Sequence, residues 1–348
     1  MMSSMRNFLM PEYLNNVART FEPQFRFNGS SEQDFSEWKE QLIKDLKEAL
    51  GPMPGKVNLN PEIIWEVEED GLIKRRVVFD VEKYMSVPAI VYIPESAKKK
   101  PAPAILCCHG HGKYGKDSVM GITSGNDPQR EKEIEGFNYD YGLQMAKQGY
   151  VTLAIDWRGF GERSVKDGYP GRDECNVLYI QAGIMGINLL ALDIFDGFCA
   201  LDYLCSLDCV DDSRIGAMGL SFGGTMTTWI SLLDERIKAA DIICYSAVFK
   251  SFAIRDGNFC GSQIIPGIFR LCDVPDLHGL IAPRPLLAEI GIHDKFFKVE
   301  DATECSRKVK MIYEAAGVGQ NYEVDLFDGD HRFSGNKAFS FFDKYLKG

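Results

Sequence analysis

From Pro101 onward, short apolar segments with the length of buried strands alternate with longer segments that have the character of helices. Residues 102–108 form an unbroken apolar run, as expected for a strand that is covered on both faces. Further strands are expected at 150–155, 215–220, 237–246, 285–290 and 322–327. Helices are expected at 141–148, 187–207, 224–233, 302–315 and 337–346. Such alternation predicts an α/β domain with a mostly parallel central sheet that is flanked by helices.

The first hundred residues follow a different pattern, which predicts an N-terminal arm and a hairpin. Residues 32–50 place apolar side chains at helical spacing, and Gly51-Pro52 ends this segment. A turn at Asp70-Gly71 separates two extended segments and indicates an antiparallel hairpin, which a third strand follows. These strands are expected at 63–69, 72–81 and 87–93. We therefore predict an arm with one helix at 1–58 and a main domain at 59–348.

Composition limits the partners that the chain can have. Its 348 residues include 39 Lys and Arg against 50 Asp and Glu, so the formal net charge is −11. This acidic balance disfavours nucleic acid and anionic membranes, since both attract clustered positive charge. The sequence has no apolar run of about 18 residues, and residues 1–10 do not resemble a signal peptide. Several cysteines lie in apolar runs, so we expect reduced thiols in a cytoplasmic protein, and homo-oligomerisation stays open.

The strongest chemical signal is the sequence Gly219-Leu-Ser221-Phe-Gly223, which lies between an expected strand and an expected helix. This context is that of a nucleophile elbow, a turn so tight that glycine is needed two residues before and two residues after the serine. The helix that follows would direct its free N–H groups toward the serine hydroxyl. The pattern predicts Ser221 as a nucleophile; an incidental serine in a glycine-rich turn is the alternative.

A serine hydroxyl needs a base, usually a histidine that a carboxylate orients. Of the five histidines, His331 follows the last expected strand, where the base belongs if the triad runs Ser, acid, His along the chain. Asp294 follows the strand at 285–290 and is the predicted acid. Asp330 is a weaker rival, because its neighbour His331 would have to fold back onto it. His293 is not expected to take part.

Acyl transfer also needs N–H donors for the oxyanion that develops on the substrate. The backbone N–H of Phe222 is one expected donor. The other is expected from the loop His109-Gly110-His111-Gly112, in which two glycines let the backbone turn inward after the strand at 102–108. A metal site at His109 and His111 is disfavoured, because no third ligand is evident and the chain has no Cys-x-x-Cys pair. We expect neither a metal nor another cofactor.

Two further segments are candidates for substrate contact. Trp157 and Arg158 follow the expected strand at 150–155, although the pattern favours an Arg158 that ties loops together through a carboxylate over one that contacts substrate. Residues 247–278 interrupt the alternation and are expected to form a short insertion over the active site. Most of its apolar side chains should pack on the core, and the rest, with Trp157 and Phe222, should wall a small apolar pocket. The apolar side chains in question are Phe249, Phe252, Phe259, Ile264, Ile265, Ile268 and Phe269.

These motifs together resemble the α/β-hydrolase superfamily, and specifically its dienelactone-hydrolase-like and acetyl-xylan-esterase-like branch. The resemblance covers residues 60–348, and the arm resembles the N-terminal extension of bacterial esterases in that branch. It rests on the segments 109–112, 156–161, 219–224, 280–285 and 291–294. Dienelactone hydrolases use a cysteine nucleophile, so Ser221 at that position favours ordinary ester hydrolysis.

The sequence therefore predicts an α/β-hydrolase fold that carries a serine esterase. Its expected partner is a small-molecule ester with a short acyl group, plausibly an acetyl ester of a sugar. Two alternatives stay open. One is a peptidase or thioesterase that uses the same triad, and the other is a catalytically silent binding protein.

Overall fold

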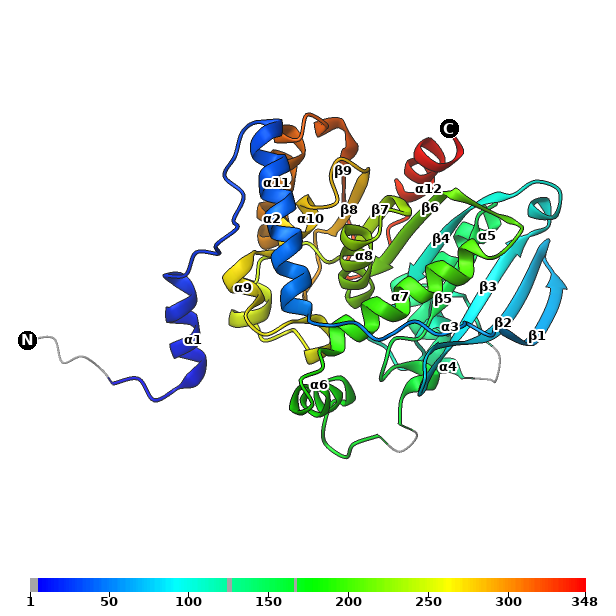
Figure 1. The fold of residues 1–348 in the computed structure, drawn as a ribbon, viewed down its shortest axis with the longest axis horizontal. Helices are drawn as coiled ribbons and strands as arrows, with labels where there is room; N and C mark the ends of the chain where they lie inside the picture. Colours follow the sequence, from blue (N-terminus) through cyan, green and yellow to red (C-terminus); the bar gives the residue numbers. More distant parts are fainter. Residues whose placement is uncertain (1–5, 124–126, 166–167) are drawn as a thin grey trace, which may run out of the picture.

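In the computed structural model, which describes residues 6–123, 127–165 and 168–348, nine strands form one sheet (Figure 1). The strand order is β1-β2-β3-β5-β4-β6-β7-β8-β9. The strands are β1 (Glu62–Glu69), β2 (Leu72–Glu82), β3 (Met85–Pro94), β4 (Ala102–Cys108), β5 (Val151–Ile155), β6 (Val210–Leu220), β7 (Ile237–Ile243), β8 (Leu286–Gly291) and β9 (Tyr322–Phe327). Neighbouring strands from β1 to β3 and on to β5 pair antiparallel, and all later pairs are parallel. The predicted mostly parallel sheet is confirmed.

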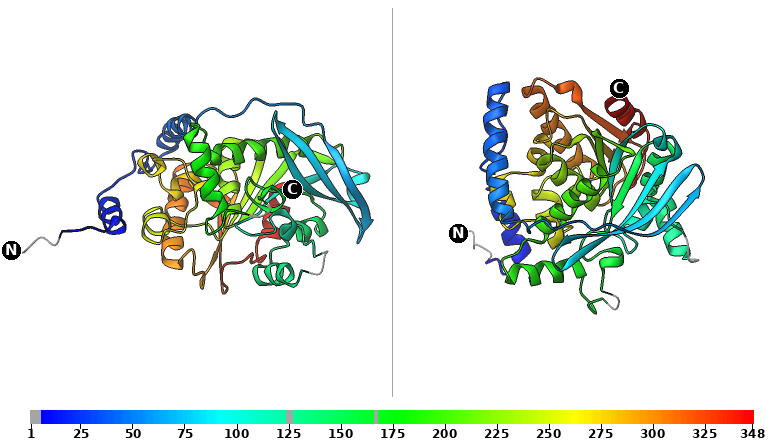
Figure 2. Two further views of the ribbon diagram at one scale, coloured as in Figure 1. Left: turned by 90° about the horizontal axis from the view of Figure 1, so that it is seen from below. Right: turned by 45° about the vertical axis from the view of Figure 1, so that its right-hand side comes forward.

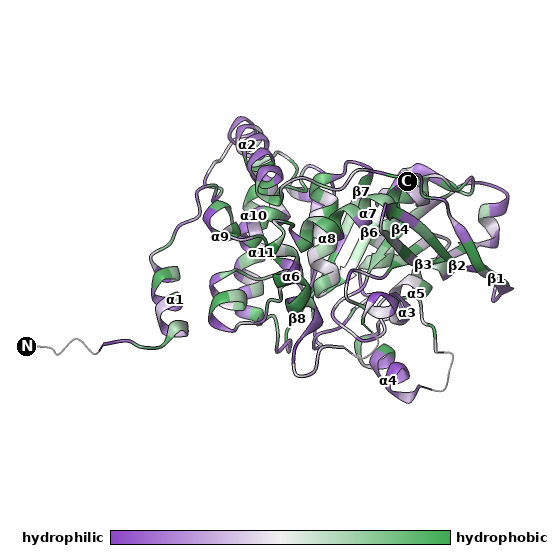
Figure 3. Ribbon diagram, turned by 60° about the horizontal axis from the view of Figure 1, so that its bottom comes forward, coloured by the Kyte–Doolittle hydropathy of each residue, from purple (hydrophilic) through white to green (hydrophobic). Residues whose placement is uncertain are grey.

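Helices cover both faces of this sheet (Figure 2). They are α1 (Met10–Arg19), α2 (Glu32–Leu50), α3 (Lys116–Val119), α4 (Pro128–Phe137), α5 (Tyr141–Lys147), α6 (Glu174–Ile184), α7 (Leu189–Cys205), α8 (Phe222–Leu233), α9 (Ile268–Leu271), α10 (Val274–Gly279), α11 (Val299–Ala315) and α12 (Ala338–Phe342). The alternation of side chains along β4 explains the two cores, because Leu106 packs with α7 and α8 on one face while Ile105 packs with α5 and α12 on the other. Figure 3 shows the central strands as hydrophobic.

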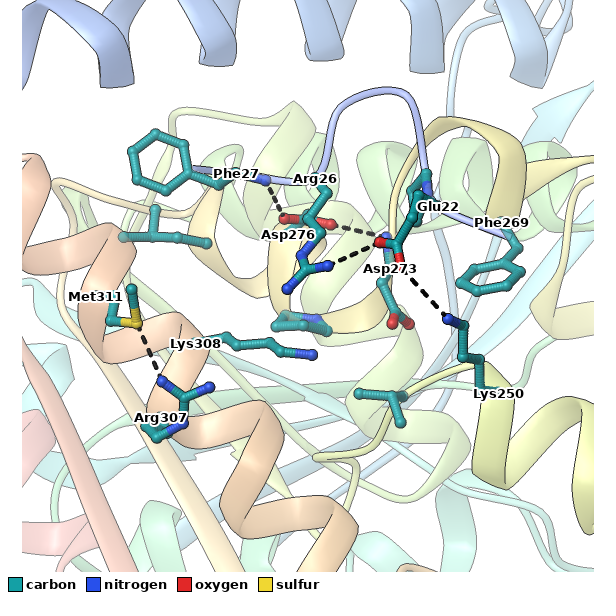
Figure 4. Close-up of a pocket in the computed structure, with 14 residues that line it drawn as sticks. Glu22, Arg26, Phe27, Lys250, Phe269, Asp273, Asp276, Arg307, Lys308 and Met311 are labelled. Carbon is teal, nitrogen blue, oxygen red and sulfur yellow. Dashed lines mark hydrogen bonds and ion pairs between the residues drawn. The ribbon is translucent and has the colours of Figure 1, made fainter. Parts of the chain in front are cut away.

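The N-terminal arm is docked on the main body by its second helix and by the segment before it. Ser31 and Asp34 form a capping box that starts α2, and Leu42 and Leu46 are fully buried beneath the helix. Ahead of α2, the backbone N–H of Phe27 donates to the Asp276 carboxylate at 3.0 Å (Figure 4). By contrast, α1 projects to the side (Figure 1) and exposes most of its apolar side chains.

Four helices outside the insertion, α1, α3, α4 and α6, were not expected from the sequence, so the arm contains two helices rather than one. Most apolar side chains of α1 are exposed, so this helix has no buried face that would give it a recognisable apolar pattern. In α4 only Ile134 is buried. This helix is mainly polar (Figure 3), so its sequence shows no apolar residues at helical spacing. The insertion at 247–278 is also more regular than expected, since it includes α9 and most of α10.

No single helix in the described ranges is long and apolar enough to cross a membrane. Only α6 and α7 taken together pass that test of length and composition, and a bend of 102° separates them.

Candidate active site

Ser221 lies at the sharp turn between β6 and α8, in a left-handed backbone conformation with φ 62°. Its backbone N–H donates to the carbonyl of Ile243 at 2.9 Å, which fixes the turn against β7. The two flanking glycines are required sterically. A Cβ atom on Gly219 would overlap the carbonyl of Gly223, and one on Gly223 would overlap the carbonyl of Cys108. The local structure is therefore the nucleophile elbow that the sequence motif predicts.

His331 and Asp294 form a directed pair beside the elbow. The Nδ1 atom of His331 lies 2.7 Å from Oδ2 of Asp294. A carboxylate can only accept, so Nδ1–H donates and Nε2 is left as the basic nitrogen. The other carboxylate oxygen accepts the backbone N–H groups of Phe296 at 2.8 Å and Phe297 at 2.9 Å, which hold Asp294 in place. The imidazole also stacks on the Phe297 ring, with 5.6 Å between ring centroids and 8° between planes.

The rival histidine and acid lie elsewhere. His293 is exposed and pairs with the equally exposed Asp328, 2.9 Å from Nε2 to Oδ1. Asp330 is exposed, and the carboxylate that contacts His331 is that of Asp294. Ser221 and His331 line the same cavity, whose volume is about 580 Å³. The structure thus gathers the three predicted residues at one end of the sheet.

The four residues that are expected to supply oxyanion donors differ in their contacts. The N–H of Gly110 donates to the hydroxyl of Tyr139 at 2.7 Å. His109 is fully buried, and its Nε2 accepts the backbone N–H of Trp157 at 3.0 Å. Burial lowers the pKa of His109 to about 4, so the ring is neutral. Phe222 supplies the first N–H of α8, which has no acceptor inside the helix.

His111 is the member of the 109–112 loop that lines the cavity with Ser221. Its ring lies 5.1 Å from that of Phe222, between centroids, so the loop and the elbow meet here. We therefore keep the backbone N–H of His111 as the expected second donor.

The expected substrate contacts of Trp157 and Arg158 do not agree with the structure. Trp157 has no exposed surface, and its indole N–H donates to the carbonyl of His109 at 3.2 Å. Arg158 is buried and binds both carboxylate oxygens of Asp196, at 2.9 and 2.8 Å, as well as Glu82 at 2.7 Å. Neither residue lines the cavity. Arg158 ties loops together through a carboxylate, which is the interpretation that the sequence favours, and Trp157 supports the 109–112 loop through its bond to His109.

Aromatic side chains from four separate segments form the walls of the cavity. The insertion contributes Phe252 and Phe259, whereas Phe249 is buried in the core, as expected for most of the insertion's apolar side chains. Phe222 is fully buried beneath the elbow and does not reach the cavity. The other aromatic wall residues are Phe137, Phe160, Phe296 and Phe297. The polar part of the wall includes Asp173, Glu174, Asn176 and Gln263.

The same cavity holds a cluster that the sequence analysis missed. His111, Cys175 and Cys260 bring a ring nitrogen and two sulfurs within 4.8 Å of one another. The Cys175 thiol, together with His111, lowers the pKa of the Cys260 thiol. These residues come from three distant segments, so no spacing signal in the sequence connects them.

The sheet order, the elbow at Ser221 and the His331–Asp294 pair define an α/β-hydrolase, which confirms the predicted fold. The chain matches the model of the Abhydrolase family over residues 9–327 and belongs to this family. The match includes most of the arm and therefore begins well before residue 60, where the sequence resemblance begins.

Similar proteins agree with this assignment. YtaP of Bacillus subtilis, named as a hydrolase, is 28% identical over 289 residues, which are 81% of this chain and 90% of YtaP. A Bacteroides fragilis structure named as an acetyl xylan esterase has a TM-score of 0.76 at 20% identity, covering 92% of this chain and 83% of that one. A glucuronoyl esterase from Solibacter usitatus has a TM-score of 0.65 at 16% identity, covering 89% and 93%. At these identities the two structures establish a shared fold.

Proposed function

We propose that the protein is a serine esterase that cleaves short-acyl carboxylic esters through an acyl-enzyme. The observation that carries the proposal is the 2.7 Å contact between His331 Nδ1 and Asp294, which leaves Nε2 as a base in the cavity that Ser221 lines. A positioned nucleophile, base and orienting carboxylate are the parts that acyl transfer requires.

The first half of the proposed reaction forms the acyl-enzyme. Ser221 Oγ bonds to the ester carbonyl carbon while its proton passes to His331 Nε2. The carbonyl oxygen becomes an oxyanion, and the N–H groups of Phe222 and His111 stabilise it. The carbon–oxygen bond to the alcohol then breaks, and His331 gives its proton to the departing alcohol oxygen.

The second half regenerates the enzyme. Water gives a proton to His331 and bonds to the acyl carbon, and the bond to Ser221 then breaks as the serine regains its proton. The acid leaves as the second product. Because protein groups and water complete both halves, the reaction needs no cofactor.

The aromatic walls support a preference for short acyl groups. Phe252 and Phe259 from the insertion line the same cavity as Ser221, and their rings pack edge to face with 4.8 Å between centroids. A longer chain would gain about 0.8 kcal/mol for each buried methylene only if there were room for it, and would clash once the pocket is full. Carboxylates of Asp173 and Glu174 at the cavity disfavour an anionic substrate. A structure named as an acetyl xylan esterase shares the fold, which supports a sugar as the alcohol.

The test is kcat/KM for acetyl, butyryl, octanoyl and palmitoyl esters of p-nitrophenol, with an acetylated sugar, an anilide and a thioester beside them. We expect the highest value for acetyl and a steep fall by octanoyl. Phe259→Ala should raise the butyryl-to-acetyl ratio by opening the wall. A maximum at eight carbons or longer contradicts the short-acyl preference, and faster cleavage of the anilide or thioester favours the peptidase or thioesterase alternative.

A further inference from the structure

The cluster at His111, Cys175 and Cys260 has the composition of a metal site. The Nε2 atom of His111 lies 3.0 Å from Sγ of Cys260, and all three potential ligand atoms lie within 4.8 Å of one another. Ligand atoms around tetrahedral zinc are about 3.5–3.8 Å apart, because Zn–S bonds measure about 2.3 Å and Zn–N bonds about 2.0 Å. Small side-chain rotations would therefore bring the three ligands to bonding distance.

The backbone around the two cysteines is already fixed. Cys175 lies in the first turn of α6, and Asn176 beside it accepts the N–H of Gly261, next to Cys260, at 2.9 Å. Gly261 packs so closely on Tyr179 of α6 that a Cβ atom there would overlap the ring. The turn and the helix thus hold the two sulfurs together before any ligand binds.

Two thiolates and one imidazole favour a borderline-soft cation such as Zn²⁺ over Mg²⁺ or Ca²⁺, which prefer oxygen ligands. Three protein ligands leave one of four tetrahedral positions open. All three residues line the cavity that contains Ser221, so the open position is accessible to water or substrate.

We propose that His111, Cys175 and Cys260 form a zinc site in the substrate cavity, and that zinc bound there inhibits the enzyme. The inhibition rests on the proposed esterase function, whereas the site itself does not. Zinc would occupy space beside Ser221 that the substrate needs. It would also pull on the ring of His111, whose backbone N–H is the proposed second oxyanion donor. A small shift of that donor weakens stabilisation of the oxyanion, because oxyanion geometry is demanding.

Metal binding is measured first and without any substrate. The reduced full-length protein is titrated with Co²⁺, whose thiolate charge-transfer absorption in the near ultraviolet reports sulfur ligands, and Zn²⁺ then displaces it. We expect one equivalent per chain. Cys175→Ala and Cys260→Ala should each weaken binding by more than about 100-fold, since even residues that merely support a ligand contribute about 10- to 100-fold. Cys199→Ala, another buried cysteine outside the cavity, is the matched control and should bind normally.

Thermal melting of each variant shows whether it is folded, and only folded variants are compared. Absence of a thiolate band in the reduced wild-type protein overturns the site. The same follows if Cys175→Ala and Cys260→Ala bind cobalt as the wild type does.

Inhibition is measured second. For each variant, the rate of ester hydrolysis in micromolar Zn²⁺ is divided by the rate of the same variant without metal. We expect strong inhibition of the wild type and of Cys199→Ala, and at least a tenfold higher inhibitory concentration for Cys260→Ala. A second group of potential ligands, Cys244, Asp294 and His331, includes the predicted base and acid themselves. Unchanged inhibition in Cys260→Ala would place the metal there and overturn the inhibitory role of the His111 site. A protein that binds cobalt as expected but hydrolyses no ester would retain the site and contradict the esterase proposal instead.

Discussion

Ser221 adopts a backbone conformation that L-residues rarely take, and the surrounding structure maintains it. Such positions cost about 1–3 kcal/mol and persist where neighbouring contacts over-determine them. Here the bond from Ser221 N–H to Ile243 and the close approach of Gly223 to Cys108 provide those contacts. The strain therefore places the hydroxyl above the end of the sheet instead of among core side chains.

Asp294 offers a clean test of the triad at the level of one residue. Oδ1 accepts two backbone N–H groups and Oδ2 accepts His331, so Asp294→Asn keeps the shape but no longer stabilises the imidazolium or fixes its tautomer. We expect kcat to fall about 10⁴-fold, the size of effect known for the equivalent change in a serine protease. Asp330→Asn, an exposed neighbour of the base, is the control and should retain nearly full activity. Equal losses in both variants would leave Asp294 without a special role.

The sequence predicted the positions of some side chains at the cavity better than those of others. Ser221, Asp294 and His331 each follow a strand of a recognisable pattern, and parallel strands bring their carboxyl ends together. Trp157 was assigned to the pocket because it follows β5 in the same way, yet its side chain turns under the loop. The direction in which a side chain points depends on packing between distant segments, and the local sequence does not record this.

Among the elements, the neighbouring strands β7, β8 and β9 carry three acidic side chains inside the sheet. Asp241 and Glu289 are fully buried, and Asp325 is nearly so. Within the described residues neither carboxylate oxygen of Asp241 has a hydrogen-bond partner, while Glu289 accepts the N–H of Ser334 at 2.7 Å. Burial and the neighbouring Glu289 charge raise the pKa of Asp241 well above its usual range, and burial raises the pKa of Glu289 to about 8.

These raised pKa values predict a pH dependence of stability with a definite sign. These carboxyl groups keep their protons in the folded protein at pH values above about 4, where the unfolded chain releases them. The stability that the retained protons contribute is therefore complete below about pH 4, and it is lost as the pH rises toward about 8. The free energy of unfolding should fall by up to about 1.4 kcal/mol per pH unit for each retained proton. Asp241→Asn, which cannot ionise, should fall less steeply and melt at a higher temperature at pH 8.

Thermal melts from pH 5 to pH 8 compare the wild type, Asp241→Asn and the exposed control Asp330→Asn. The control should follow the wild type. Parallel profiles for the wild type and Asp241→Asn would show that Asp241 holds no proton in the folded protein.

The bounds of a helix or strand could be predicted where its side chains are buried on one face or on both. Residues 32–50, 102–108 and 322–327 agree with α2, β4 and β9 to the residue, because their apolar patterns reflect contacts with the core. The patterns of α1 and α4 could not reveal them, since α1 buries only Ala18 and α4 only Ile134. A helix with so little buried surface has almost no apolar period to detect.

At the scale of the whole molecule, the proposed chemistry depends on segments that the fold brings together from most of the chain. Ser221 comes from the end of β6, Asp294 from the loop after β8 and His331 from the loop after β9. The strand order places these three ends side by side. The walls of the cavity come from α4, α6, the insertion and the loops that contain Phe160, Phe296 and Phe297, whose positions depend on tertiary packing. The sequence thus predicts that Ser221, Asp294 and His331 lie at one end of the sheet, but it does not predict the shape of the pocket or the His111 cluster.

The central claim is that Ser221 is the nucleophile of an esterase, and covalent labelling tests it most directly. A fluorophosphonate probe should attach to the reduced protein once, at Ser221, as located by mass spectrometry of its peptides. In Ser221→Ala the label should disappear and kcat for an acetyl ester should fall about 10⁴- to 10⁶-fold, while the exposed control Ser213→Ala keeps both. Labelling at another residue, or hydrolysis by Ser221→Ala at the wild-type rate, would contradict the account.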